Sequence, residues 1–87
     1  MEAFIVSACV YVLALEDDCW YVGITYNLNL RMGQHWAGEG AKWTRLHKPV
    51  RLAEVIYPAN KDTENQITEK YRELYGTDKV RGGKWTK

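Results

Sequence analysis

The sequence lacks several features that would narrow its function at once. Its 87 residues contain only two cysteines, two histidines and two prolines, and the formal net charge is +1. So small a net charge identifies no binding partner by itself. The cysteines and histidines do not have the spacing of a zinc finger, and no glycine-rich phosphate-binding loop is present. These absences argue against a zinc-binding module and a P-loop nucleotide-binding domain.

Long hydrophobic runs are also absent. The apolar run from Ala3 to Leu15 is too short to span a bilayer, and Glu2 stands where a secretory signal would have basic residues. Cys9 and Cys19 fall at opposite ends of an expected hairpin, so we expect two free thiols in the core, as in a reducing compartment. The sequence therefore predicts a cytoplasmic protein without a membrane segment.

The length and composition predict one domain, residues 1–87, with a modest core. A hydrophobic fraction of 46% and an aromatic fraction of 13% are typical of a globular chain. Basic residues gather at 31–51 and in a glycine-rich tail at about 79–87, whereas the acids gather in the first turn and around the second helix. This separation indicates a one-sided surface for a polyanion. Basic loops that are simply solvated would give the same pattern.

Two short β-branched segments, Ala8 to Leu15 and Cys19 to Ile24, predict strands joined by an acidic turn. If the turn has three residues, Tyr11 lies opposite Gly23, and Tyr11 and Tyr21 point to the same face of the sheet. A two-residue turn would separate the tyrosines, because a slip of one residue reverses the faces of a strand. The register of this hairpin therefore decides whether two phenols can act together.

The rest of the chain predicts two amphipathic helices and one more strand. The first helix runs from about Asn27 to Trp36, Ala37 to Pro49 is expected to be a loop, and Val50 to Tyr57 is a third strand that Pro58 ends. The second helix runs to about Tyr75. The order β-β-α-β-α predicts an α+β fold, a three-stranded antiparallel sheet flanked by helices. The candidate caps are Thr25 or Asn27 for the first helix, and Asn60 or Asp62 and then Gly76 for the second.

Helical spacing places two polar residues beside the apolar stripe of the first helix. The stripe consists of Leu28, Met32 and Trp36 at four-residue steps. Arg31 and His35 are also four residues apart and lie along the edge of the stripe. We therefore expect both side chains at the rim of the core.

The second helix places one acid on its apolar face, where the stripe consists of Ile67, Tyr71 and Leu74. Glu64 lies one turn before Ile67 on this face. A carboxylate without a partner is costly there, so Glu64 would need a cation, a hydrogen-bond donor or a metal ion. The alternative is a first-turn acid that the helix dipole favours.

Two basic segments with similar sequences, Ala41-Lys42-Trp43-Thr44-Arg45 and Gly83-Lys84-Trp85-Thr86-Lys87, lie far apart in the chain. We expect both to contact phosphates beside an aromatic surface. The alternative is that Trp43 and Trp85 only anchor their loops.

Taken in order, these pieces resemble the GIY-YIG nuclease domain over almost the whole chain. The match is closest to small single-domain members similar to the N-terminal domain of excinuclease C and to structure-selective nuclease subunits. Val10 and Val22 stand where the naming motifs have isoleucine. The residues that carry the resemblance are Val10-Tyr11-Val12, Tyr21-Val22-Gly23-Ile24-Thr25, Asn27-Leu28-Asn29-Leu30-Arg31, His35, Gly40-Ala41-Lys42-Trp43-Thr44 and Glu64.

The resemblance implies hydrolysis of a DNA phosphodiester with one divalent metal ion, Mg²⁺ or Mn²⁺ in its place. Many family members carry an asparagine about a dozen residues after the glutamate; here Asp78 or a tail residue would replace it. The implied metal ligand is Glu64, and the implied catalytic residues are Tyr11, Tyr21, Arg31, His35 and Glu64. The expected DNA-binding residues are Gly23, Lys42, Trp43, Arg45, Lys48, Arg81 and Lys84.

The residue types suit this chemistry. The planar fork of Arg31 can bind phosphate oxygens, and Tyr21 can donate a hydrogen bond to a phosphate or a water. Tyr11 is the candidate base, although a phenol with a pKa of ~10 needs nearby cations or a metal ion to lose its proton. His35 can accept that proton. Each residue alone has an ordinary alternative role, as a core aromatic or a helix-surface pair.

Two other hypotheses fit the same fold, a non-catalytic nucleic-acid-binding module and a nuclease subunit that acts only with a partner. One site cuts one strand at a time, so cutting both strands would require a homodimer, two visits or a targeting partner protein. The sequence does not show the preferred DNA sequence or structure.

Overall fold

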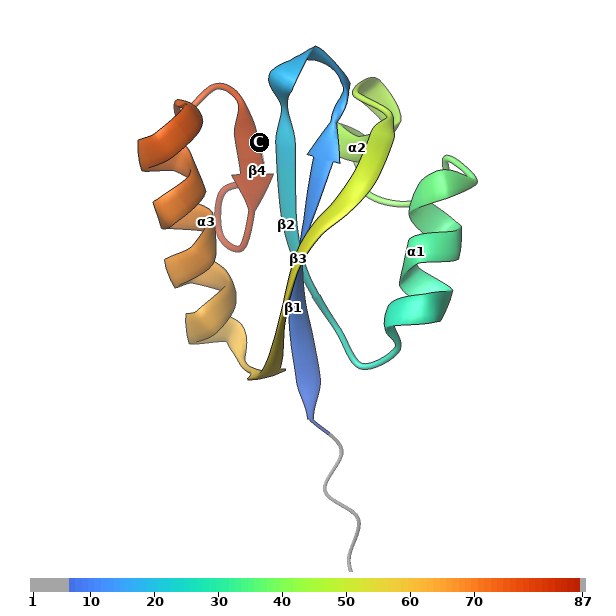
Figure 1. Ribbon diagram of the computed structural model, residues 1–87, viewed down its shortest axis with the longest axis vertical. Helices are drawn as coiled ribbons and strands as arrows, with labels where there is room; N and C mark the ends of the chain where they lie inside the picture. The colour runs from blue at the N-terminus through green and yellow to red at the C-terminus, as the bar shows by residue number, and fades with distance from the viewer. Residues whose placement is uncertain (1–6, 87) are drawn as a thin grey trace, which may run out of the picture.

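The structure is a computed structural model that describes residues 7–86. Residues 1–6, where the apolar run begins, and Lys87 of the tail lie outside this range. One sheet stands between helices on its two faces (Figure 1). The elements are β1 (Ala8–Leu15), the 3₁₀ turn η1 (Glu16–Asp18), β2 (Trp20–Thr25), α1 (Leu28–Trp36), α2 (Lys42–Leu46), β3 (Pro49–Ala59), α3 (Lys61–Tyr75) and β4 (Val80–Gly82).

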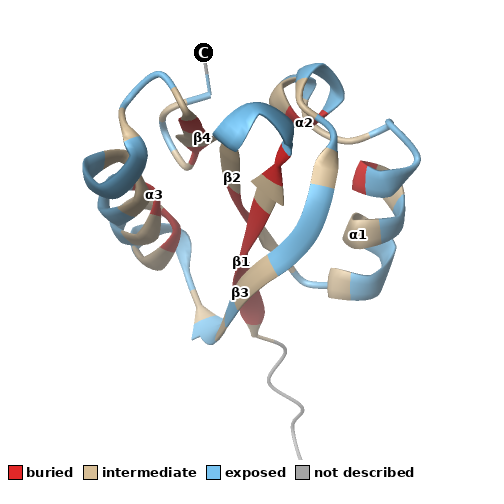
Figure 2. Cartoon of the chain, turned by 45° about the horizontal axis from the view of Figure 1, so that its top comes forward, coloured by how far each residue is buried: buried red, intermediate tan, exposed pale blue. Residues whose placement is uncertain are grey.

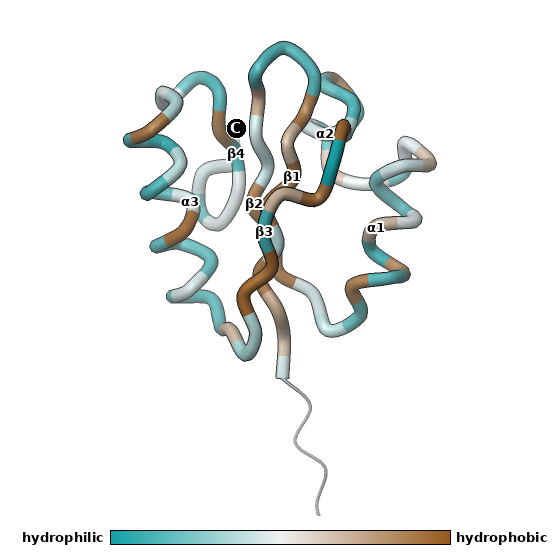
Figure 3. Tube along the Cα trace, in the orientation of Figure 1, coloured by the Kyte–Doolittle hydropathy of each residue, from teal (hydrophilic) through white to brown (hydrophobic). Residues whose placement is uncertain are grey.

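The hairpin of β1 and β2 has the three-residue turn that puts both tyrosines on one face. The backbone N–H of Leu15 donates to the carbonyl of Cys19 at 2.8 Å, and Tyr11 lies opposite Gly23. Within η1, Asp17 has a φ of 64°, a left-handed conformation that aspartate tolerates better than most residues. Figure 3 shows this turn as a hydrophilic tip beyond the apolar strands.

The sheet has four strands in the order β3-β1-β2-β4, so the expectation of three antiparallel strands was wrong. β1 pairs antiparallel with β2 and β3, whereas β4 pairs parallel with β2. The tail was expected to be a loop because Val80–Gly82 is short and contains glycine. Its pairing depends on α3, which returns the chain to the free edge of β2.

Two further boundaries differ from the expectations. The segment expected as a loop contains α2, which has five residues, too few for a clear apolar period. β3 continues through Pro58 to Ala59, and a proline fits there because β3 is an edge strand whose outer N–H groups need no partner in the sheet.

The core lies on both faces of β1 (Figure 2). On one face, Val10, Val12 and Val22 are fully buried and pack against side chains of α3 such as Ile67. On the other face, Leu13, Leu15 and Cys19 pack with residues of α1 and α2, Met32 and Trp43. Cys9 and Cys19 are buried free thiols, as expected.

The structure shows which of the candidate residues cap the two longer helices. The Asn27 side chain accepts a hydrogen bond from the N–H of Leu30 at 3.1 Å and caps α1. Asn60 caps α3 in a reciprocal pair with Thr63, and Gly76 follows α3 at a φ of 104°.

The apolar stripes are shorter than expected. Trp36 at the end of α1 is 49% exposed and Leu74 near the end of α3 is 62% exposed, so the buried part of each stripe ends before these residues. No helix among residues 7–86 has both the length and the apolar character needed to cross a membrane.

Candidate functional site

Tyr11 and Tyr21 lie on the face of the sheet that α1 and α2 cover. Their ring centroids are 6.2 Å apart, with the rings edge to face. Gly23 makes room for this arrangement, because a Cβ at that position would overlap the ring and hydroxyl of Tyr11. A glycine at the middle of β2 therefore has a specific packing reason.

Two side chains of α1 reach the same place. Arg31 Nε donates a hydrogen bond to the Tyr11 hydroxyl at 3.3 Å, and His35 Nε2 lies 2.7 Å from that hydroxyl. The His35 ring also lies 5.3 Å from the Tyr21 ring, centroid to centroid. The four-residue spacing on one helical turn brings both groups to the tyrosines. The expectation of His35 at the rim of the core was wrong, because His35 is 1% exposed.

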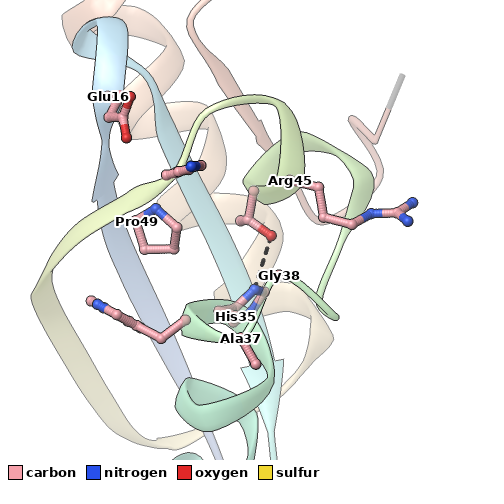
Figure 4. A pocket seen from close by; sticks show the side chains of 9 residues that line it. Glu16, His35, Ala37, Gly38, Arg45 and Pro49 are labelled. Carbon is pink, nitrogen blue, oxygen red and sulfur yellow. Dashed lines mark hydrogen bonds between the residues drawn. The ribbon is translucent and has the colours of Figure 1, made fainter.

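The far side of the His35 ring contacts α2. His35 Nδ1 lies 3.0 Å from Thr44 Oγ1 (Figure 4, dashed line). Gly40 allows the chain to pass close to the ring, because a Cβ there would overlap Nδ1. A pocket of about 430 Å³ is lined by both partners of this bond and by seven other residues.

Thr44 is a part of the site that sequence reasoning missed. It is 1% exposed, and it lies in a segment for which we expected only phosphate contacts. One indication of a role for Thr44 was present in the sequence: it belongs to the segment from Gly40 to Thr44, which is part of the family resemblance.

Burial sets the protonation states of the site. It raises the pKa of Tyr11, with repulsion from Tyr21 the next cause and the charge of Arg31 acting in the opposite direction. Burial likewise raises the pKa of Tyr21. Burial and then the charge of Arg31 lower the pKa of His35 to about 4. At neutral pH the site thus holds two neutral phenols, a neutral imidazole and one guanidinium.

Glu64 lies on α3, the helix that packs on the opposite face of the sheet from the tyrosine rings. As expected, it points inward and is 6% exposed. Its negative charge contributes to the raised pKa of both Tyr11 and Tyr21, so both phenols lie within its electrostatic reach. Lys61 Nζ, on an exposed side chain, lies 3.4 Å from Glu64 Oε1.

Thr86 of the second basic segment lies close to the first segment, whereas Lys84 and Trp85 lie against α3. A pocket of about 410 Å³ lies between α2 and the tail, lined by Lys42, Trp43, Leu46, Arg81 and Thr86. Because Arg81 pairs with Tyr21 in the sheet, its side chain lies on the tyrosine face. Its guanidinium stacks 4.5 Å from the ring centroid of Trp43.

Both tryptophans of these segments have structural contacts. Trp43 Nε1 donates a hydrogen bond to the Trp20 carbonyl at 3.0 Å, which fastens α2 to β2. Trp85 lies between two cations, with the Arg72 guanidinium 5.2 Å and the Lys84 ammonium 4.9 Å from its ring centroid. These contacts agree with the anchoring role that we considered as the alternative, and a DNA contact by Trp43 stays a prediction.

The other expected nucleic-acid contacts lie at the surface. Lys42, Arg45, Lys48 and Lys84 are all exposed. Asp78, the candidate replacement for the asparagine, is exposed in the turn between α3 and β4. Among residues 7–86, no hydrogen bond joins Asp78 to the tyrosine site.

Comparison with known proteins identifies relatives of the chain. A family profile described as the GIY-YIG catalytic domain matches residues 7–81. A UPF0213 protein of Bacillus cereus is 36% identical over 66 residues, which cover 76% of this chain and 69% of that protein. The UPF0213 protein YazA of Bacillus subtilis is 33% identical over 79 residues, covering 79% and 77% of the two chains. The comparison with solved structures gave no significant match.

Proposed function

The chain belongs to the GIY-YIG family of nuclease domains, and on this premise we propose that it is a metal-dependent DNA endonuclease that hydrolyses one phosphodiester bond at a time. The observation that carries the proposal is the contact between Tyr11 and His35, at 2.7 Å. The pKa of His35 is lowered to about 4, so the imidazole is neutral at physiological pH; it is a weak base, and it takes the proton of Tyr11 as Tyr11 receives the proton that leaves the water. A buried phenol beside a neutral base suits the activation of water.

The residues present fit a Mg²⁺ ion better than other metals. Among residues 7–86, no group of three or more histidine, cysteine or acidic side chains gathers around one point. The donor set is therefore the single buried carboxylate of Glu64. Mg²⁺ suits such a site because it keeps several waters and shares phosphate oxygens, and Mn²⁺ accepts similar ligands. When bound, the ion would neutralise charge at the phosphate and lower the pKa of a bound water.

The side chains around the tyrosines bind the phosphate and move the proton. Arg31 binds non-bridging oxygens through its fork, and Tyr21 donates a hydrogen bond to the phosphate. As a water attacks phosphorus, its proton passes to the Tyr11 oxygen and the proton of Tyr11 passes to His35 Nε2. The bond from phosphorus to the leaving oxygen breaks, and this oxygen takes a proton from solvent.

The surface beside the site suits a nucleic-acid backbone. Exposed Lys42 and Arg45 on α2 and Lys48 after it form a cationic margin next to the tyrosine face. Contacts of this kind position a duplex without reading its sequence.

The test is cleavage of supercoiled plasmid and of branched DNA with Mg²⁺, with Mn²⁺ and with EDTA. We expect metal-dependent nicking that is lost in Glu64→Gln and Arg31→Ala, while thermal unfolding shows that both variants fold. Glu69→Gln is the matched control, because Glu69 lies exposed on the same helix. Full activity of both site variants would overturn the proposal. Metal-independent binding without cleavage by the wild type would instead identify a binding module.

A further inference from the structure

Five groups of the site form one continuous hydrogen-bonded chain. Arg31 Nε lies 3.3 Å from the Tyr11 hydroxyl, which lies 2.7 Å from His35 Nε2. His35 Nδ1 lies 3.0 Å from Thr44 Oγ1, which donates to the Ala41 carbonyl at 2.8 Å. The three middle side chains are each 1% exposed, so their hydrogen bonds are made within the protein.

The first and last of these five groups determine which partner donates in each hydrogen bond. The N–H of Arg31 can only donate and the carbonyl of Ala41 can only accept. Because the Tyr11 oxygen accepts from Arg31, the proton of its hydroxyl is directed at His35 Nε2. Because Thr44 gives its proton to the carbonyl, its oxygen accepts from His35 Nδ1. Both ends thus place the proton of the neutral imidazole on Nδ1.

We propose that Thr44 is a positioning residue, which holds neutral His35 as the Nδ1–H tautomer so that Nε2 is free to accept the proton of Tyr11. In the opposite tautomer, Nε2–H would donate to the Tyr11 oxygen and could take up no proton. The hydroxyl proton of Tyr11 would then have no acceptor among these five groups, and an unpaired donor in a buried side chain costs free energy. The effect of Thr44 on rate rests on the proposed nuclease function, whereas the tautomer does not.

The same bond serves the step after proton transfer. His35 then carries a proton on each nitrogen, and the Thr44 oxygen stays in place as the acceptor for Nδ1–H. The ionisable and charged groups around His35 are Tyr11, Tyr21 and Arg31 on the sheet side, and Glu16, Arg45 and Lys48 around the pocket.

The first test is the tautomer itself, read from the ¹⁵N chemical shifts of His35 by NMR at pH 7 without metal or DNA. We expect the wild type and Thr44→Ser to show a protonated Nδ1 and an unprotonated Nε2. Thr44→Val keeps the shape of the side chain but has no oxygen, so we expect its shifts to move toward the Nε2–H form. A wild type in the Nε2–H form would overturn the inference, even if Thr44→Val fails to fold.

The second test is steady-state cleavage by the same proteins. We expect kcat to fall about tenfold or more in Thr44→Val with KM unchanged, and to recover in Thr44→Ser. An unchanged kcat in folded Thr44→Val, or equal loss in both variants, would overturn the role of the hydroxyl. If the wild type shows the Nδ1–H tautomer but cleaves nothing, the proposed function fails and the assignment of the hydrogen-bond chain stands.

Discussion

The hydroxyl of Tyr11 and Nε2 of His35 lie 2.7 Å apart, although 24 positions separate the two residues in the chain. Tyr11 lies at the middle of β1, and His35 is the buried residue of α1. The contact therefore exists only when α1 is packed on the sheet. Any chemistry that uses this pair depends on the packing of the whole face.

Two glycines provide a matched test of that packing. Gly23→Ala would put a Cβ against Tyr11, so we expect the free energy of unfolding to fall by about 1–3 kcal/mol and cleavage to be lost. Gly33 lies within α1 with open space around it, so Gly33→Ala should raise the stability by about 0.5–1 kcal/mol. Urea unfolding measures both changes. Wild-type stability and cleavage in Gly23→Ala would contradict the packing argument.

The stability of the protein should depend on pH through His35. The pKa of this group is about 4 when folded and about 6.5 when unfolded, so the unfolded chain binds the proton first as the pH falls. The stabilisation is complete above pH ~6.5 and is lost as the pH falls toward ~4, by at most about 3 kcal/mol. We expect His35→Gln to lose less stability over this interval than the wild type.

Urea unfolding at several pH values between 4 and 7 measures this difference in slope. His47→Gln is the control, because the side chain of His47 is 24% exposed and pairs with Asp17 at the surface. Equal slopes for the wild type and His35→Gln would contradict the assignment of a neutral buried imidazole.

The pocket beside His35 allows a chemical rescue experiment. We expect His35→Ala to lower kcat by about 10²- to 10⁴-fold. Removal of the ring should join the 430 Å³ pocket to the space beside Tyr11, so added imidazole should restore part of the activity in a saturable manner. Wild type with imidazole and His47→Ala with imidazole are the controls. A folded His35→Ala variant that imidazole does not rescue would count against proton acceptance by His35.

The exposed cations of α2 should contribute to DNA affinity through phosphate contacts. In a Glu64→Gln background, we expect Arg45→Ala to weaken duplex binding and to reduce the slope of log K against log salt by about 0.9. Lys70→Ala is the control, because Lys70 lies exposed on α3, away from the tyrosine face. Fluorescence anisotropy across a salt series measures both slopes. Equal slopes in the two variants would exclude Arg45 from the interface.

The local parts of the fold were predictable from the sequence because local chemistry determines them. The sequence predicted the hairpin and its acidic turn but left two turn lengths open, and the structure has the three-residue turn that puts Tyr11 and Tyr21 on one face. Asn27 and Asn60 were named as candidate caps because their side chains can accept from a helix N-terminus. The inward direction of Glu64 followed from helical spacing.

The parts that were missed depend on contacts between distant segments. β4 has three residues and pairs only because α3 brings it to β2. α2 has neither a side-chain cap nor a clear period, and packing of Trp43 against the sheet supports it. Thr44 reaches His35 only after both helices are in place. Tertiary packing, which no local pattern encodes, accounts for these three differences.

The parallel pairing of β4 with β2 also bears on where the chain can be shortened. Removal of the residues after Lys79 would leave the backbone of β2 around Val22 without its partner strand, along an unprotected edge of the sheet. Such an edge invites strand exchange and aggregation. The same deletion would remove the Arg81 guanidinium that stacks on the indole of Trp43. We therefore expect a fragment that ends before β4 to be poorly soluble and less stable on the face of the sheet that carries the tyrosines.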